Sequence, residues 1–226
     1  MRTFNLEVAV NVDESSVDLD WTSHLTVSLF YQPRLIGEAT LRDTLFIPDK
    51  YNKASIKLED FNIRNMVGFK AFIQHFLPNN VDNGIGDDDG LTIAGCSVDE
   101  AHELSLNIEL TGITKTYVDQ FRIRLFGGRV TVDFILSNVN PIQLDFRNCV
   151  FSLERGGNVL ALLDGYFDIE LGGSEIVLEG DAIVADTNFS GIAILKGVRA
   201  LEESNTWIAH AIRSFEAKVN LGRKHL

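Results

Sequence analysis

The sequence predicts a mainly β protein made of two tandem antiparallel β-sandwich domains, each with one amphipathic helix. Three observations predict this class. Apolar and polar residues alternate with a period of two along much of the chain, as they do in strands with one buried face. Glycine-rich turns separate the alternating runs. Two distant stretches of the chain follow the same order of predicted elements.

Strands with one buried and one solvated face are predicted by four clear runs of alternation, at residues 104–111, 121–125, 130–137 and 167–171. Half-buried strands of this kind are typical of antiparallel sheets, because strands of parallel sheets are buried on both faces. Turn signals lie between the runs at residues 32–34, 127–128, 155–158 and 172–173. The paired glycines favour tight hairpins, since glycine accepts positive φ at little cost.

Helical periodicity is confined to two segments. In residues 66–77 the apolar positions recur every three or four residues, and Pro78 follows as a stop signal. In residues 207–219 the same spacing is set by Ile208, Ala211, Ile212, Phe215 and Val219. We expect both apolar stripes to pack on a sheet, in preference to lining a cofactor groove.

An internal repeat divides the chain into a first domain at residues 1–116 and a second at residues 117–226. Leu19-Asp20-Trp21 matches Leu144-Asp145-Phe146, and each block leads into a hairpin. Each copy begins with a strand, at residues 6–12 and 130–136, and later reaches its amphipathic helix. The second copy ends soon after that helix, which predicts either a truncated final strand or a strand completed by other sequence.

The net charge of −12 makes nucleic acid a poor partner, because an acidic surface repels phosphate. Anionic lipid headgroups are disfavoured for the same reason. The two cysteines, Cys96 and Cys149, are compatible with one disulfide, and we favour two buried thiols. The first residues do not resemble a signal peptide, and no apolar run is long enough to span a membrane. These features fit a cytosolic protein or the soluble part of a longer one.

Two segments carry a family resemblance. Residues 136–146 read Leu-Ser-Asn-Val-Asn-Pro-Ile-Gln-Leu-Asp-Phe, and residues 35–41 lead to Phe46-Ile47-Pro48. Together they resemble the late-embryogenesis-abundant type 2 (water-stress and hypersensitive-response) family. The resemblance implies a fibronectin-like or immunoglobulin-like β-sandwich with a helix. Tandem copies are similar to fungal members, which implies a membrane-anchored protein with its repeats on the lumenal side of an endomembrane such as the vacuole.

The sequence lacks the motifs by which enzyme sites are recognised. It has no phosphate-binding glycine loop and no serine-nucleophile elbow. The five histidines are scattered, and His102-Glu103 is not followed by a second histidine at helical spacing. We therefore expect a protein that is not an enzyme and needs no cofactor.

Two candidate sites remain. Asp82, Asp87, Asp88 and Asp89 lie among glycines in residues 79–90, and clustered carboxylates of this kind bind calcium. Their spacing does not fit an EF-hand, so we favour a solvated loop over a calcium site. Asn188-Phe189-Ser190 is an N-glycosylation sequon, which is used only in the secretory pathway.

The function expected from these features is a non-enzymatic binding or structural module, the soluble lumenal part of a membrane-associated protein. One alternative is a structural subunit of a larger assembly of the virion or phage-tail type, since duplicated β domains suit strand exchange. Another is a carrier that holds an apolar ligand between the Phe-rich helix and the sheet. We expect a protein partner or self-association, with lipid as a further option. If the family resemblance does not hold, we expect a cytoplasmic location.

Overall fold

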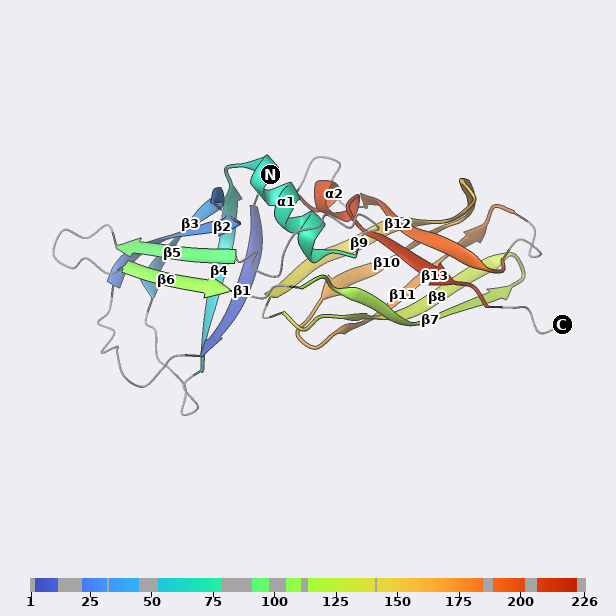
Figure 1. Cartoon of the computed structure of the whole chain (residues 1–226), viewed down its shortest axis with the longest axis horizontal. Coiled ribbons are helices and arrows are strands. Elements are labelled where there is room, and N and C mark those ends of the chain that lie inside the picture. Colours follow the sequence, from blue (N-terminus) through green and yellow to red (C-terminus); the bar gives the residue numbers. More distant parts are fainter. Residues whose placement is uncertain are drawn as a thin grey trace.

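The structure is a computed structural model that describes residues 3–11, 22–31, 33–44, 53–78, 91–97, 105–110, 114–140, 142–184, 189–201 and 207–222. Strands make up most of the described residues and form two antiparallel sheets, and the described residues contain two helices. The prediction of a mainly β, antiparallel protein is therefore confirmed. The two sheets lie end to end along the long axis, and both helices lie where the sheets meet (Figure 1).

The first sheet contains six strands: β1 (Thr3–Asn11), β2 (Thr22–Tyr31), β3 (Arg34–Thr44), β4 (Lys53–Ile63), β5 (Leu91–Ser97) and β6 (Ser105–Leu110). Their order across the sheet is β6-β5-β2-β3-β4-β1. Its buried side chains include Val27, Leu29 and Tyr31 of β2, at alternate positions of the strand. This is the period-two burial that the sequence predicts.

The second sheet contains seven strands: β7 (Tyr117–Phe126), β8 (Arg129–Ser137), β9 (Ile142–Arg155), β10 (Asn158–Ile169), β11 (Ser174–Ala182), β12 (Ile192–Ala200) and β13 (Glu216–Asn220). They follow the order β13-β12-β9-β10-β11-β8-β7. The turns at residues 127–128 and 156–157 have positive φ at both glycines, which matches the twist of a tight hairpin. The two sheets meet in a short antiparallel pairing of β1 with β9, Glu7 with Gln143 and Val8 with Ile142.

Six strands of the second sheet have the same neighbours as the six strands of the first. The pairs β2–β3, β1–β4, β3–β4, β2–β5 and β5–β6 correspond to β9–β10, β8–β11, β10–β11, β9–β12 and β12–β13. The strand β7 is an addition at the edge beside β8. The strand β13, with five residues, stands where the six-residue strand β6 stands in the first sheet.

The first helix is α1 (Met66–Phe76), and its predicted range is confirmed. The side chain of Asn65 caps its start by accepting hydrogen bonds from the backbone N–H groups of Val67 and Gly68, at 3.0 and 3.2 Å. The helix ends before Pro78, as the sequence predicts. Its buried residues form one stripe along the helix: Gly68, Phe69, Phe72, Ile73 and Phe76.

The predicted second helix is only partly correct, because α2 (Trp207–Ile212) spans only the first half of it. Phe215 lies in the turn that follows, and Val219 lies on β13. Residues 216–220 alternate in burial and pair with β12. They therefore form a strand, although the spacing of their apolar residues also fits a helix. The two helices are also not equivalent, because α1 connects β4 to β5 whereas α2 connects β12 to β13.

Gly197 of β12 allows the last turn of α2 to approach the sheet. A Cβ atom at this position would overlap the carbonyl oxygen of Ile212. The backbone N–H of Gly197 donates to the carbonyl of Phe215 at 3.0 Å. Only a residue without a side chain allows this approach, which places Phe215 in the core.

We predict that Gly197→Ala lowers the free energy of unfolding by about 3 kcal/mol, because the added methyl group has no space. Urea unfolding of the full chain measures this. Gly157→Ala is the control, since its φ is +82° and no atom lies within 4 Å of the added Cβ. The control loses only about 1 kcal/mol, the cost of left-handed backbone. Equal losses in the two variants would contradict the close approach.

Candidate functional site

The junction between the two sheets is organised by α1, whose first turn is attached to the first sheet. The backbone N–H groups of Arg64 and Asn65 both donate to the carbonyl of Ile36 on β3, each at 3.0 Å. A Cβ on Gly68 would lie 3.2 Å from the carbonyl oxygen of Leu35, so the helix approaches β3 closely. The start of α1 is thus fixed relative to the first sheet by backbone contacts.

The other end of α1 is attached to the second sheet. The carbonyl of Phe76 accepts hydrogen bonds from the backbone N–H and the side-chain hydroxyl of Thr116, both at 2.9 Å. The carbonyl of Pro78 accepts one from the backbone N–H of Glu216 at 2.7 Å. Carbonyls at a helix C-terminus have no partner within the helix. Here the segment before β7 and the first residue of β13 satisfy them.

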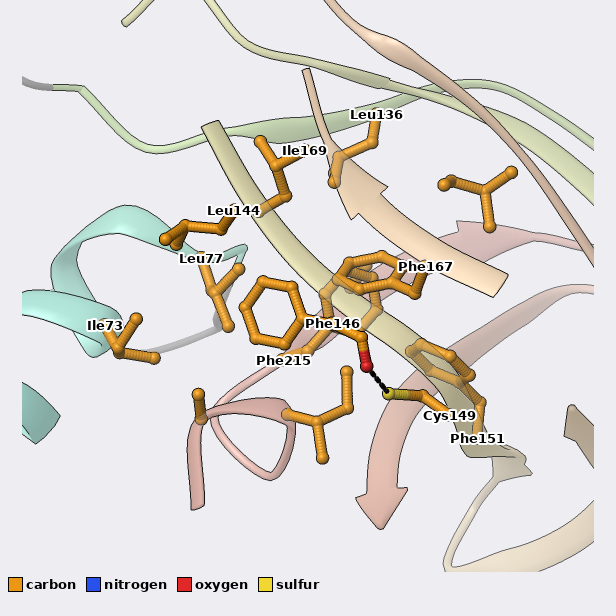
Figure 2. Packing of buried hydrophobic residues seen from close by; sticks show 14 of the residues in the cluster. Ile73, Leu77, Leu136, Leu144, Phe146, Cys149, Phe151, Phe167, Ile169 and Phe215 are labelled. Carbon is orange, nitrogen blue, oxygen red and sulfur yellow. Dashed lines mark hydrogen bonds between the residues drawn. The ribbon is translucent and has the colours of Figure 1, made fainter. Parts of the chain in front are cut away.

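Aromatic side chains make contacts on both sides of this junction. Tyr31 of β2 packs against Phe72 of α1 with ring centroids 6.0 Å apart. Phe69 of α1 meets Trp207 of α2 edge to face at 6.0 Å, and Trp207 meets Phe146 of β9 at 5.5 Å. Ile73 and Leu77 lie beside Phe146 and Phe215 in the same core (Figure 2). One apolar core therefore extends from the first sheet into the second.

Asn138 and Asn140, which follow β8, form a buried polar network. The amide nitrogen of Asn138 donates to the carbonyls of Ile142 and Glu170, at 2.8 and 3.0 Å. The side chain of Asn140 exchanges two hydrogen bonds with the backbone of Thr114, at 2.8 and 2.9 Å, and also donates to Asn138. These groups satisfy one another and the backbone, so the motif holds residue 114 and the strand ends together.

A cluster of carboxylates and one tyrosine lies on the solvent-facing side of β9 and β10. The carboxylate of Asp145 accepts hydrogen bonds from the Tyr166 hydroxyl at 2.9 Å and from the backbone N–H of Arg147 at 2.8 Å. The bond to Asp145, followed by burial, raises the pKa of Tyr166 to about 12. Burial is the largest cause of the raised pKa of Asp168, and the charges of Glu170 and Asp145 add to it.

The end of the second sheet that lies away from the junction carries exposed apolar side chains. Phe126, directly before the hairpin turn at residues 127–128, is 90% exposed. Ile183 is 58% exposed and Ile192 is 63% exposed. The backbone N–H of Ala182 donates to Gly128, and Arg155 donates to the carbonyl of Ser190, so these turns are neighbours. We call them the distal loops, residues 126–129, 155–158, 182–184 and 190–192. A depression of about 420 Å³ among them is lined by Arg155, Asn158, Val159, Leu160, Ile183 and Val184.

The site residues predicted from sequence lie outside the described residues. This holds for the calcium candidates Asp82, Asp87, Asp88 and Asp89 and for the sequon asparagine Asn188, so these stay predictions. Within the described ranges, no three His, Cys, Asp or Glu side chains are grouped so that they could hold a metal ion. In the same part of the chain, no helix is both long and apolar enough to cross a membrane.

Cys149 is a buried thiol, as expected, and its Sγ donates to the carbonyl of Phe146 at 3.3 Å (Figure 2). The side chain of Cys96 lies outside the described part of the chain, so its state stays a prediction. Sequence reasoning missed the cluster around Asp145 and the exposed Phe126. The first depends on strand register, which the sequence does not display. The second had a signal, an aromatic residue directly before the turn glycines.

Comparison with known proteins assigns no family to this chain. A scan against protein-family models finds no match, and a search of the curated proteins finds no similar sequence.

We predict that Phe69→Ala lowers the free energy of unfolding by about 3–4 kcal/mol, because it leaves a cavity between α1 and Trp207. Urea unfolding followed by tryptophan fluorescence, in a background that carries Trp21→Phe, measures both the stability and the surroundings of Trp207. Lys70→Ala is the control, since Lys70 is the exposed neighbour on the same helix, and it should change stability by less than about 0.5 kcal/mol. If Phe69→Ala were as stable as this control, α1 would not connect the two sheets.

Proposed function

We propose that this chain is a non-enzymatic module of two tandem β-sandwich units, held in a fixed relative orientation, that acts by binding. The observation that carries the proposal is the attachment of α1 to both sheets, with its start on β3 and its end bonded to Thr116 and Glu216. A helix bonded at both ends and packed in a shared core resists hinge motion. Because the two sheets are then held at a fixed spacing, a partner bound by each sheet would also be held at a fixed distance, which suits a scaffold.

The repeated strand order supports the tandem arrangement. Six strands in each sheet share the same neighbours, which is the arrangement expected if one unit was duplicated. In the second sheet, the edge strands β7 and β13 come close together without pairing. The sheet therefore curves around its aromatic core, as the two layers of a sandwich do. A fibronectin-like or immunoglobulin-like unit of the type 2 late-embryogenesis-abundant kind fits this pattern.

The packing of the aromatic core favours a structural role for it over the carriage of an apolar ligand. The rings of Phe146, Phe151 and Phe215 each lie with their centroids 5.3 Å from that of Phe167. This is contact distance for aromatic pairs. Between α1 and the first sheet, Phe72 likewise packs on Tyr31 at 6.0 Å, so the rings themselves fill the space that a ligand would need. The exposed apolar side chains lie instead at the distal loops, where they suit contact with a protein partner.

The lumenal location that the family resemblance implies predicts a glycan on Asn188. Intact mass measurement of the protein purified from its native cells, before and after endoglycosidase treatment, tests this. We expect a mass loss on treatment, and Asn188→Gln expressed in the same cells should show none. An unmodified pool recovered from the cytosol would contradict the lumenal location.

Self-association in a larger assembly is the second candidate, and the exposure of Phe126 favours it. An aromatic ring that is 90% exposed gains apolar contact when two copies meet.

We predict that the sedimentation coefficient of the intact chain rises with concentration and that Phe126→Ser abolishes this rise. The stability of the variant should change by less than about 0.5 kcal/mol, because the ring lies outside the core. Val67→Ser is the control, as it removes another exposed apolar side chain, on α1, and should leave the rise intact. A wild-type chain that stays monomeric at all concentrations would rule out the assembly candidate.

A further inference from the structure

The carboxylate cluster lies on a bulge in β9. Tyr166 pairs with Asn148 and Asp168 pairs with Asp145, so two residues of β9, Phe146 and Arg147, stand opposite the single Phe167. Arg147 has a φ of 56°, in the left-handed region that only a few residue types adopt without strain. A bulge of this kind changes which side chains of the strand point inward.

The Asp145 carboxylate stabilises the bulge from both strands. One of its oxygens, Oδ1, accepts from the backbone N–H of Arg147 inside the bulge and from the hydroxyl of Tyr166 on β10, at 2.8 and 2.9 Å. An ionised acceptor strengthens both hydrogen bonds. The position of the bulge therefore depends on Asp145.

Asp168 is the residue directly across from Asp145, and two like charges at paired positions destabilise a sheet. Asp168 is half-buried, and its carboxyl is hydrogen-bonded to Glu170. Among the charged groups around it, Glu170 on β10 has the larger effect on its pKa and Asp145 on β9 adds to it, while Arg147 on β9 acts on Tyr166. On β11, the acidic Glu179 stands opposite Asp164, farther along β10.

The bulge also connects this cluster to the junction between the sheets. Phe146, one of its two residues, points inward and lies 5.3 Å from Phe167 and 5.5 Å from Trp207 between ring centroids. Trp207 in turn meets Phe69 of α1. A shift of the bulge would therefore change the ring contacts that hold the two sheets together.

We propose that the Asp145–Asp168 pair is a pH-sensitive latch that tightens the junction between the two sheets when the pH falls. Protonation of Asp168 removes the repulsion across the bulge, so Asp145 holds Arg147 and Tyr166 more firmly and Phe146 packs more closely on Trp207. When Asp168 is ionised, the repulsion acts against this arrangement. The latch operates whether or not the chain is a lumenal binding module.

The direction of the effect follows from the raised pKa of Asp168. A carboxyl whose pKa is higher in the folded state than in the unfolded state binds its proton more tightly when folded. Its contribution to stability is fully present below the ordinary aspartate pKa and is lost as the pH rises through the raised value. Acidification from neutral pH therefore stabilises the latch, opposite to the usual effect on carboxylates in salt bridges.

Comparison of wild-type protein with Asp168→Asn, from about pH 7 to about pH 4, tests the latch. The chain has two tryptophans, Trp21 and Trp207. Both proteins therefore carry Trp21→Phe, which leaves Trp207 as the only fluorescent tryptophan. At neutral pH we expect Asp168→Asn to raise the urea midpoint by about 0.3 M and to shift Trp207 fluorescence to the blue. Both differences from wild type should shrink as the pH falls toward about 4, because the raised pKa of Asp168 favours its protonation over this range.

Two further variants make the result decisive. Asp145→Asn removes the same repulsion but keeps an oxygen that can accept both hydrogen bonds, so it should reproduce the fluorescence shift at neutral pH. Asp164→Asn is the matched control, because Asp164 faces Glu179 on β11 and not the bulge, and it should leave Trp207 fluorescence unchanged. The proposal is contradicted if Asp168→Asn does not raise the urea midpoint, or raises it equally at every pH, or raises it without a change in Trp207 fluorescence.

Discussion

The contact of α1 with both sheets is the constraint on which the rest of the structure depends. Its buried stripe contacts both sides of the junction, because Phe72 packs on Tyr31 of the first sheet and Phe69 packs on Trp207 of α2, which in turn packs on Phe146 of the second sheet. Among the described residues, direct pairing of β1 with β9 involves two residue pairs. Such a short pairing would leave the two sheets free to rotate, so the helix determines their relative orientation.

Glycine and asparagine residues make this arrangement possible by removing steric and polar conflicts. Gly68 and Gly197 allow the two helices to approach the backbone of the sheets. Asn138 and Asn140 satisfy buried backbone groups where the strands end. A buried amide left without partners would destabilise the fold, so the aromatic core and this polar network depend on each other.

Much of the fold could be predicted from the sequence, since alternation of apolar residues and paired glycines report directly on strands and hairpins. The range of α1 was also predictable, because its stripe and Pro78 are local signals. The end of α2 was not, since Phe215 and Val219 fit a helical spacing and only the pairing of β13 with β12 decides between the two. The cluster around Asp145 depends on a one-residue shift in register, which no local pattern encodes. The calcium site weighed for residues 79–90 and the glycan on Asn188 stay predictions.

The position of α1 also bears on how such a protein could arise and be divided. In the sequence, α1 directly follows the first four strands of the first sheet, yet its last turn caps the core of the second sheet. A break at residue 116 would leave the second unit without Ile73 and Leu77 over Phe146 and Phe215 (Figure 2). After a duplication, the two copies would therefore have become dependent on each other. Recombination that exchanged one copy alone would expose apolar surface on both, and selection would then keep the pair together.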